Sequence, residues 1–355
     1  MNNFWKNKKV FLTGHTGFKG SWLSLWLQAL GAKVTGYALL PSTNPNMFDR
    51  ASIEDGMISI IGDIRDINHL SNAIRGSNPE IVIHMAAQSL VRYSYQNPAE
   101  TYATNVMGTV NILEAVRSLK KVRSFINVTS DKCYENKEWL WGYREVDSLG
   151  GHDPYSSSKA CSELITNAYR ESFFSINNFE EHKNAIASAR AGNVLGGGDW
   201  SNDRLVPDFI RSITNKKLID IRNPNAMRPW QHVLEPLKGY LLLAENLYNH
   251  GSKYAEAWNF GPNNFDVKSV NEILELLIFH WEEAVGVNLK KDPSNLHEAF
   301  LLKLDSSKAR AKLNWQSKWD INESIKRTCE WYKAHLKNQD MRAYSLKEIL
   351  DYERL

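Results

Sequence analysis

The sequence predicts an α/β protein built on a doubly wound parallel sheet with a smaller C-terminal lobe. Through the first half of the 355-residue chain, short β-type runs alternate with helical patterns, which is typical of a parallel sheet with helices on both faces. After residue 191 the sequence pattern changes to loops rich in Gly, Asn, Asp and Pro between further helical patterns. We therefore expect residues 1–190 to form the sheet domain and residues 191–355 to form most of a ligand-binding lobe, with an interleaved boundary.

The expected strands are short apolar runs, and the expected helices repeat apolar residues at spacings of three and four. The expected strands are Lys9–Thr13, Lys33–Ala38, Met57–Ile61, Ile81–His84 and Ser124–Thr129. The expected helices are Pro98–Leu119, Pro154–Phe174, Pro207–Thr214, Leu234–Leu247 and Val267–Ala284. Loops on such a scaffold usually carry the ligand contacts, and the expected C-terminal loops are Gly192–Asp203, Asn223–Pro229 and Gly261–Asp266.

The composition narrows the class of protein. A hydrophobic content of 43% supports a sizeable core, and a net charge of +3 from 43 basic and 40 acidic residues argues against a nucleic-acid surface. The three cysteines, Cys133, Cys161 and Cys329, lie in no metal-type spacing, so we expect neither a disulfide framework nor a bound metal. No apolar run reaches membrane-spanning length and no cationic leader precedes the first strand. We expect a cytoplasmic protein with a small-molecule ligand.

A glycine motif follows the first expected strand. The residues are Gly14-His15-Thr16-Gly17-Phe18-Lys19-Gly20, and a helical stretch follows over Ser21–Leu30. Glycine lets the main chain approach a pyrophosphate, whose charge then lies at the helix N-terminus. The strand, turn and helix together therefore predict a Rossmann-type dinucleotide site, with all seven motif residues as candidate contacts. A tight turn without a ligand is the alternative.

The GxxGxxG spacing resembles that of the extended short-chain dehydrogenases and reductases. The resemblance implies NAD as cofactor, with further contacts from Asp63, Ile64, Ala86, Ala87 and Gln88. The alternative for the acidic element at residue 63 is a turn carboxylate or a helix N-cap at Asp66.

The second expected strand departs from the usual NAD pattern. It ends in Tyr37-Ala38-Leu39-Leu40, without the Asp or Glu that would bind the ribose hydroxyls. No arginine for a 2'-phosphate replaces it, so we favour NAD and expect its ribose to be held weakly.

Tyr155 and Lys159 are four positions apart at the start of an expected helix, so their side chains share one face. An ammonium beside a phenol favours the phenolate and lowers the pKa of the tyrosine, which suits proton removal from an alcohol. The order of this pair after the glycine motif matches the family, which implies a catalytic and cofactor-binding role for both residues. An exposed helix pair without chemistry is the alternative.

The segment Ser130-Asp131-Lys132 follows the fifth expected strand, where side chains face the ligand crevice of a parallel sheet. It resembles the sugar-nucleotide 4,6-dehydratases, which usually carry Thr-Asp-Glu here, and a lysine in third place is similar to the branch that acts on CDP-glucose. The resemblance implies that Asp131 protonates the leaving hydroxyl, that Ser130 assists Tyr155, and that Lys132 either takes the C5 proton or stabilises the enolate. A structural ion pair between Lys132 and Asp131 is the alternative.

The C-terminal half resembles the nucleotide-sugar-binding segments of the same family. The candidate substrate contacts are Gln88, Ser130, Asn193, Arg204, Arg228 and Asn259. A guanidinium fork fits phosphate oxygens, so Arg228 is expected at the diphosphate. His232 has no second ligand at metal spacing, and we expect no metal there.

The resemblance implies a hydro-lyase that converts CDP-glucose into CDP-4-keto-6-deoxyglucose for deoxysugar synthesis, for example of O-antigen lipopolysaccharide. Another nucleotide-sugar 4,6-dehydratase or a 4-epimerase of the same fold is the alternative. The two long helices at Pro98–Leu119 and Pro154–Phe174 resemble the interface helices of family dimers, so we expect a homodimer or a dimer of dimers.

Overall fold

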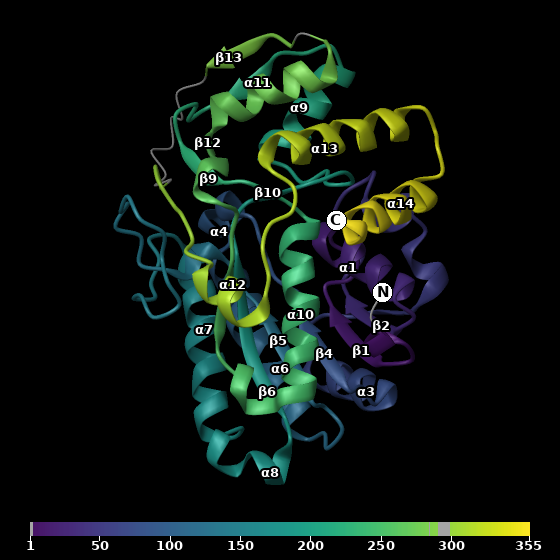
Figure 1. Cartoon of the computed structure of the whole chain (residues 1–355), viewed down its shortest axis with the longest axis vertical. Helices are drawn as coiled ribbons and strands as arrows, with labels where there is room; N and C mark the ends of the chain where they lie inside the picture. Colours follow the sequence, from purple (N-terminus) through teal and green to yellow (C-terminus); the bar gives the residue numbers. More distant parts are fainter. Residues whose placement is uncertain (1–2, 284, 290–298) are drawn as a thin grey trace.

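A seven-stranded parallel sheet forms the centre of the computed structural model, which describes residues 3–283, 285–289 and 299–355 (Figure 1). The strand order is β11-β6-β5-β4-β1-β2-β3. The bounds are β1 Lys9–Thr13, β2 Lys33–Ala38, β3 Ile58–Ile61, β4 Ile81–His84, β5 Ser124–Val128, β6 Ala185–Ala191 and β11 Ala257–Phe260. The predicted α/β class and parallel sheet are confirmed, and the five predicted strands agree with β1–β5 to within one residue.

Helices cover both faces of the sheet because successive strand residues point to opposite sides. On β1, Phe11 packs into a core with α3 (Ile67–Ser77) and α6 (Gly108–Arg117), whereas Val10 and Leu12 pack into a second core with α1 (Phe18–Ala29) and α10 (Leu234–His250). The second core is larger because the C-terminal helices extend it. This division is the doubly wound arrangement that the sequence predicts.

The remaining elements surround this sheet. The other helices are α2 Met47–Arg50, α4 Val91–Gln96, α5 Pro98–Tyr102, α7 Pro154–Ser172, α8 Phe179–His182, α9 Leu205–Thr214, α11 Val270–Trp281, α12 Ser307–Leu313, α13 Ile321–Leu336 and α14 Met341–Arg354. Three small two-stranded sheets pair β7 Val194–Leu195 with β10 Gln231–His232, β8 Ile219–Ile221 with β13 Val287–Leu289, and β9 Met227–Pro229 with β12 Val267–Ser269. Among the described residues, no helix is long and apolar enough to span a membrane.

Two predicted helices differ from the structure. The helix predicted over 98–119 is divided into α5, a π-helical turn at Ala103–Met107 and α6. The helix predicted from Val267 begins at Val270, because residues 267–269 pair with β9 and Ser269 then forms a capping box with Glu272. Its predicted end, Ala284, lies outside the described residues.

The two halves of the chain share the central sheet. Strand β11 comes from the C-terminal half and pairs with β6 at the sheet edge, and α10 packs beside β5 and β6. The division at residue 190 therefore does not separate the sheet from the lobe, and the assignment of a ligand to each half stays a prediction.

Candidate active site

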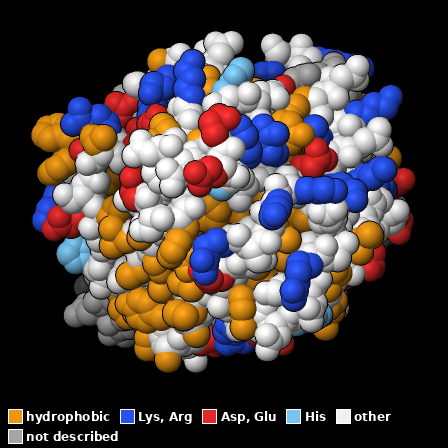
Figure 2. Space-filling view, turned by 90° about the horizontal axis from the view of Figure 1, so that it is seen from below, with side chains coloured by type: hydrophobic (Ala, Val, Ile, Leu, Met, Phe, Trp, Pro, Cys, Tyr) orange, Lys and Arg blue, Asp and Glu red, His pale blue; other side chains and the backbone are white. Residues whose placement is uncertain are grey.

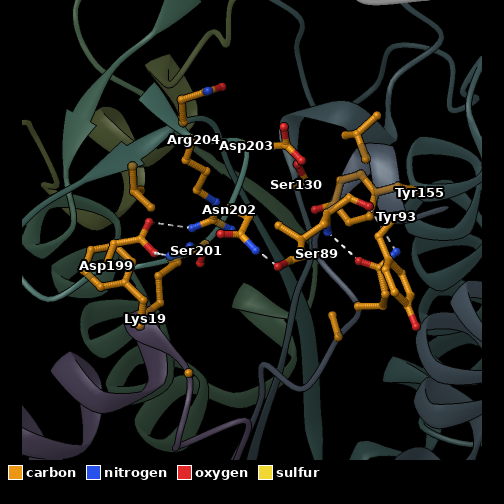
Figure 3. Close-up of a pocket in the computed structure, with 18 of the residues that line it drawn as sticks. Lys19, Ser89, Tyr93, Ser130, Tyr155, Asp199, Ser201, Asn202, Asp203 and Arg204 are labelled. Carbon is orange, nitrogen blue, oxygen red and sulfur yellow. Dashed lines mark hydrogen bonds and ion pairs between the residues drawn. The ribbon is translucent and has the colours of Figure 1, made fainter. Parts of the chain in front are cut away.

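The carboxyl ends of the strands open into a cavity of about 880 Å³, which both halves of the chain line. The loop after β1 forms one part of its wall, and the segment 191–208 with Arg228 and Trp230 forms another. In Figure 3, Asp199 and Arg204 lie on one side and Ser130 and Tyr155 on the other. A parallel sheet binds ligands at this edge.

The glycine loop leaves no room for side chains at two positions. A Cβ on Gly14, whose φ is +77°, would lie 2.8 Å from the main-chain nitrogen of Ala86, and one on Gly20 would lie 2.0 Å from the carbonyl oxygen of Gly14. Helix α1 begins at Phe18, inside the motif and three residues before the predicted start, and no side chain caps its N-terminus at Gly17. Such a bare cradle at a helix N-terminus fits the pyrophosphate of a dinucleotide.

His15 lies differently from its motif neighbours. Its side chain is buried, its Nε2 lies 2.8 Å from Ser59 Oγ, and its ring packs against Phe48. Burial lowers the pKa of His15 to about 4. Thr16, Gly17, Phe18, Lys19 and Gly20 line the cavity, but the His15 side chain does not. The imidazole of His15 thus lies in the core and not at the cavity, and the cofactor contact of this residue stays a prediction.

The acidic element after β3 provides an N-cap and two cavity-lining residues, and the cofactor contact of Asp63 and Ile64 stays a prediction. Asp66 caps α3 by accepting from the main-chain nitrogens of Asn68 and His69. Asp63 and Ile64 line the cavity, while Arg65 binds the Asp63 carboxylate at 2.6 Å and lowers its pKa. This part of the cavity thus has a carboxylate that Arg65 of the same loop already binds.

The loop after β4 also reaches the cavity. Ala86, Ala87 and Gln88 line it, and Asn105 fixes the main chain of Gln88 through two hydrogen bonds of 2.8 and 2.9 Å. The Gln88 amide nitrogen donates to Thr101 Oγ1 at 2.9 Å. Asn105 therefore fixes the main chain of the loop after β4 through Gln88.

Ser130, Asp131 and Lys132 follow β5, and Tyr155 and Lys159 lie in the first two turns of α7. All five residues line the same cavity. Local sequence fixes both segments: Ser130 caps the short 3-10 turn Asp131–Cys133, and Asp153 caps α7, whose first residue is Pro154.

Burial dominates the electrostatics of this cluster. It raises the pKa of Asp131, although the Lys132 charge and a 2.9 Å hydrogen bond from Ser130 oppose the shift. The Oδ2 atom of Asp131 has no hydrogen-bond partner among the described residues. Burial also lowers the pKa of Lys159 to about 8, against the charge of Glu163. A carboxyl group that favours its proton can act as an acid.

The pKa of Tyr155 corrects a prediction from the sequence. The sequence predicts that Lys159 lowers it, but burial raises it to about 12, and the opposing effects come from Ser130 and Arg204. The Lys159 ammonium donates to the carbonyl oxygen of Val128 at 3.3 Å. The four-residue spacing brings both groups to the cavity, but in this structure the balance of burial and charge does not stabilise the phenolate.

Five of the six predicted substrate residues line the cavity: Gln88, Ser130, Asn193, Arg204 and Arg228. Asn259 is the exception, and its substrate contact stays a prediction. Its amide is fully buried, donates to the carbonyl oxygens of Tyr143 and Asp305, and accepts from the Tyr134 hydroxyl. The sequence cannot show this, because Asn259 lies on an edge strand whose neighbours come from distant segments.

Two contacts made by cavity-lining side chains, Asp199–Arg204 and Lys19–Tyr240, were not predicted. Asp199 binds Arg204 at 2.8 Å and so places the guanidinium beside Ser89. Lys19 donates to the Tyr240 hydroxyl at 2.9 Å, and burial with the charges of Lys159 and Arg204 lowers its pKa to about 7. The only sequence signal for the Asp199–Arg204 pair is an Asp five residues before an Arg in a glycine-rich loop. No sequence signal indicates the contact between Lys19 and Tyr240.

Comparison with known proteins agrees with this geometry. The sequence model of the family described as GDP-mannose 4,6 dehydratase matches residues 11–328. The chain belongs to this family. A relative in Salmonella typhimurium, named CDP-glucose 4,6-dehydratase, is 52% identical over 350 residues, which cover 99% of this chain and 97% of the relative. A dTDP-glucose 4,6-dehydratase of Xanthomonas campestris is 24% identical over 90% of this chain and 92% of its own length.

Solved structures of other proteins share the fold. The dTDP-glucose 4,6-dehydratase of Bacillus anthracis in complex with NAD superposes with a TM-score of 0.78, at 21% identity, over 94% of this chain and 98% of that one. The dTDP-glucose 4,6-dehydratase of Streptomyces venezuelae with NAD bound gives 0.80 at 21% identity, over 93% and 98%. UDP-glucose 4-epimerase of Thermotoga maritima gives 0.77 at 22% identity, over 92% and 99%. The fold thus occurs in dehydratases and epimerases, and the site must distinguish them.

Proposed function

We propose that the protein converts CDP-glucose into CDP-4-keto-6-deoxyglucose and water with bound NAD. The observation that carries the proposal is the meeting of Ser130-Asp131-Lys132 with Tyr155 and Lys159 in one cavity. An epimerase of this fold has no use for an elimination acid, whereas the buried Asp131 carboxyl favours its proton. The choice of CDP-glucose rests on the 52% identical relative and on Lys132 in third place.

The cofactor would lie against the loop Gly14–Gly20, with Ile64 and Ala86 on the neighbouring wall. When bound, NAD would supply reversible hydride transfer at the sugar carbons C4 and C6, so that the net reaction is an elimination of water. Residues 1–190 then provide the cofactor site and the reacting side chains. Residues 191–355 provide mainly the nucleotide-sugar site, with Asn193, Arg204 and Arg228.

The side chains divide the proton transfers between them. Tyr155, with Ser130 and Lys159 beside it, removes the proton of the sugar 4-hydroxyl. The resulting 4-ketone acidifies the C5 proton, and Lys132 either takes this proton in its neutral form, directly or through water, or stabilises the enolate as an ammonium. Asp131 delivers its proton to the departing 6-hydroxyl. Arg228 and Arg204 bind the substrate diphosphate, because guanidinium forks match phosphate oxygens.

We also propose that the protein forms a homodimer, or a dimer of dimers, through α5–α6 and α7. Hydrophobic side chains gather on one side of the molecule in the view from below (Figure 2). The exposed large hydrophobic residues of this region are Tyr102 of α5, Met107 of the π-helical turn and Leu164 of α7. Equilibrium sedimentation should show at least a dimer at micromolar concentration, and a monomer would contradict this part of the proposal.

The proposal places the enzyme in deoxysugar synthesis in the cytoplasm, and an assay of the purified protein tests its chemistry. CDP-glucose should give a 4-keto product that absorbs in alkali, without net reduction of added NAD. Turnover of dTDP-, UDP- or GDP-glucose in place of CDP-glucose would overturn the base assignment and leave the elimination standing. Formation of CDP-galactose would instead identify a 4-epimerase.

A further inference from the structure

A buried ion pair lies beneath the catalytic segment. Glu163 of α7 and Arg190 of β6 form a salt bridge of 2.9 Å, and their side chains are 3% and 4% exposed. The energetic gain from such a pair is small, because the cost of removing both charges from water offsets much of their attraction. Neither side chain lines the cavity. Its position directly behind the reacting groups therefore suggests a role other than stability.

Glu163 holds the residue in front of the catalytic segment. Thr129 donates to Glu163 Oε1 at 2.5 Å, and Ser188 donates to Oε2 at 2.6 Å. Thr129 directly precedes Ser130, at the point where β5 ends. The carboxylate thus connects helix α7, which carries Tyr155, to the start of the segment that carries Asp131.

Arg190 holds the residue behind the same segment. Its Nη1 donates to the Tyr134 hydroxyl at 2.7 Å, and its guanidinium lies 4.9 Å from the centre of that ring. Tyr134 follows the 3-10 turn Asp131–Cys133 and in turn donates to Asn259 Oδ1 at 2.7 Å. The two partners of one ion pair therefore hold both ends of the segment Ser130–Cys133.

The pair also affects the lysine of the α7 motif. Glu163 lies one helical turn after Lys159 on the same face. Its negative charge is the largest influence that opposes the effect of burial on the pKa of Lys159. Arg190 and the hydrogen bonds from Ser188 and Thr129 in turn keep the pKa of Glu163 below its usual range, although burial alone would raise it.

We propose that Glu163 and Arg190 are positioning residues that clamp Ser130-Asp131-Lys132 in register with Tyr155 and Lys159. The inference rests on the proposed function, because it assigns oxidation to one of these groups and elimination to the other. With the clamp, the acid and base of the elimination keep their places at C5 and C6 while the α7 pair deprotonates the 4-hydroxyl that bound NAD would oxidise. Loss of the clamp should therefore slow the elimination more than the oxidation.

Glu163→Gln in the full chain with NAD tests the clamp, and Glu235→Gln is the matched control. Glu235 is also fully buried and accepts from Trp319 N at 2.8 Å and from the Tyr352 hydroxyl at 2.6 Å, but it does not touch the segment. Hydrogen exchange of the amides at 129–134 should accelerate in Glu163→Gln alone. Its kcat should fall about 10- to 100-fold with KM unchanged, and the kinetic isotope effect of C5-deuterated substrate should increase.

The effect of the Glu163 charge on the pKa of Lys159 can be measured separately, from the pH dependence of activity. Without the Glu163 charge the alkaline limb of the pH profile should move to lower pH, which a loss of packing would not cause. Arg190→Lys keeps a cation but cannot reach Glu163 and Tyr134 together, so it should leave that limb in place and still accelerate exchange at Tyr134. Arg190→Lys also provides the test of the clamp if Glu163→Gln does not fold.

The clamp is overturned if Glu163→Gln and Glu235→Gln give the same exchange and the same C5 isotope effect. Failure of the proposed function is distinguishable: the native protein would then not convert CDP-glucose, while the exchange difference between the two variants would persist.

Discussion

Two buried carboxylates on either side of the end of β5 behave in opposite ways. Burial acts to raise the pKa of both. At Glu163, below the cavity, a salt bridge to Arg190 and two hydroxyl donors outweigh burial and lower the pKa. At Asp131, in the cavity, Lys132 and Ser130 are too weak to do so, and one oxygen has no partner among the described residues.

The difference shows that the residues around Glu163 form a scaffold beneath the cavity, whereas Asp131 belongs to the reacting site. A fully hydrogen-bonded carboxylate keeps a fixed charge and can hold neighbouring residues in place. A buried and incompletely paired carboxyl retains its proton more readily and can deliver it to a leaving group. Completing the partners of Asp131, or removing those of Glu163, should therefore affect different properties of the enzyme.

The largest expected effect is on catalysis, from Asp131→Asn. Product formation should fall about 10²- to 10⁴-fold, the usual contribution of general acid catalysis, because the amide has no proton to give. Oxidation at C4 should survive, which transfer of deuterium from C4-labelled substrate to the cofactor would measure. Equal loss of both steps would contradict the division of roles between Asp131 and Tyr155.

The next effect is on stability, from Arg190→Met. This change leaves Glu163 as an uncompensated buried charge, and the free energy of unfolding should fall by about 3–5 kcal/mol. Denaturant unfolding of the holoenzyme measures it. The double variant Glu163→Leu with Arg190→Met should regain most of the stability but not the activity; recovery of both would mean that the pair serves packing alone.

The sequence predicts the residues of the reacting site but not the Glu163–Arg190 pair beneath it. Strand ends, the glycine cradle, Ser130-Asp131-Lys132 and the α7 pair were predictable, because each is a local pattern of spacing and residue type. The Glu163–Arg190 contact depends on the pairing of β5 with β6, in which Val128 lies opposite Ala189, and on where α7 crosses them. No local pattern encodes such a register.

The same reasoning explains the predicted site residues whose side chains lie away from the cavity. His15 and Asn259 have the residue types of ligand contacts, but their side chains turn toward Ser59 and toward Tyr143, which are distant in sequence. Residue type predicts what a group can bind. Only the packed structure decides whether a ligand or the protein itself binds it.

A smaller effect concerns the pH dependence of stability, with opposite signs for the two carboxylates. The raised pKa of Asp131 stabilises the fold below the ordinary value of 3.8, and this contribution is lost as the pH rises through the folded value. The lowered pKa of Glu163 stabilises the fold above 4.5, and this contribution is lost as the pH falls through the folded value.

Thermal unfolding of Asp131→Asn and Glu163→Gln across this range measures both contributions. Relative to the native protein, Asp131→Asn should gain stability as the pH rises above 3.8. The deficit of Glu163→Gln should be greatest near neutrality and should shrink as the pH falls below 4.5. If the stability of both variants changed with pH in the same way, the opposite pKa shifts of Asp131 and Glu163 would be contradicted.

The smallest expected effect lies at the other end of the cavity, where a carboxylate is missing and not merely unpaired. Leu39 follows β2, lines the cavity and is 57% exposed, and Thr16 Oγ1 fixes its carbonyl oxygen at 2.8 Å. Leu39→Asp would supply the acceptor for the ribose hydroxyls. Because a hydrogen bond to a charged group contributes about 1.5 kcal/mol or more, NAD affinity should rise about 10-fold in a calorimetric titration. Leu39→Asn, which lacks the charge, should gain less; equal affinities for the two variants would mean that the ribose lies beyond the reach of this residue.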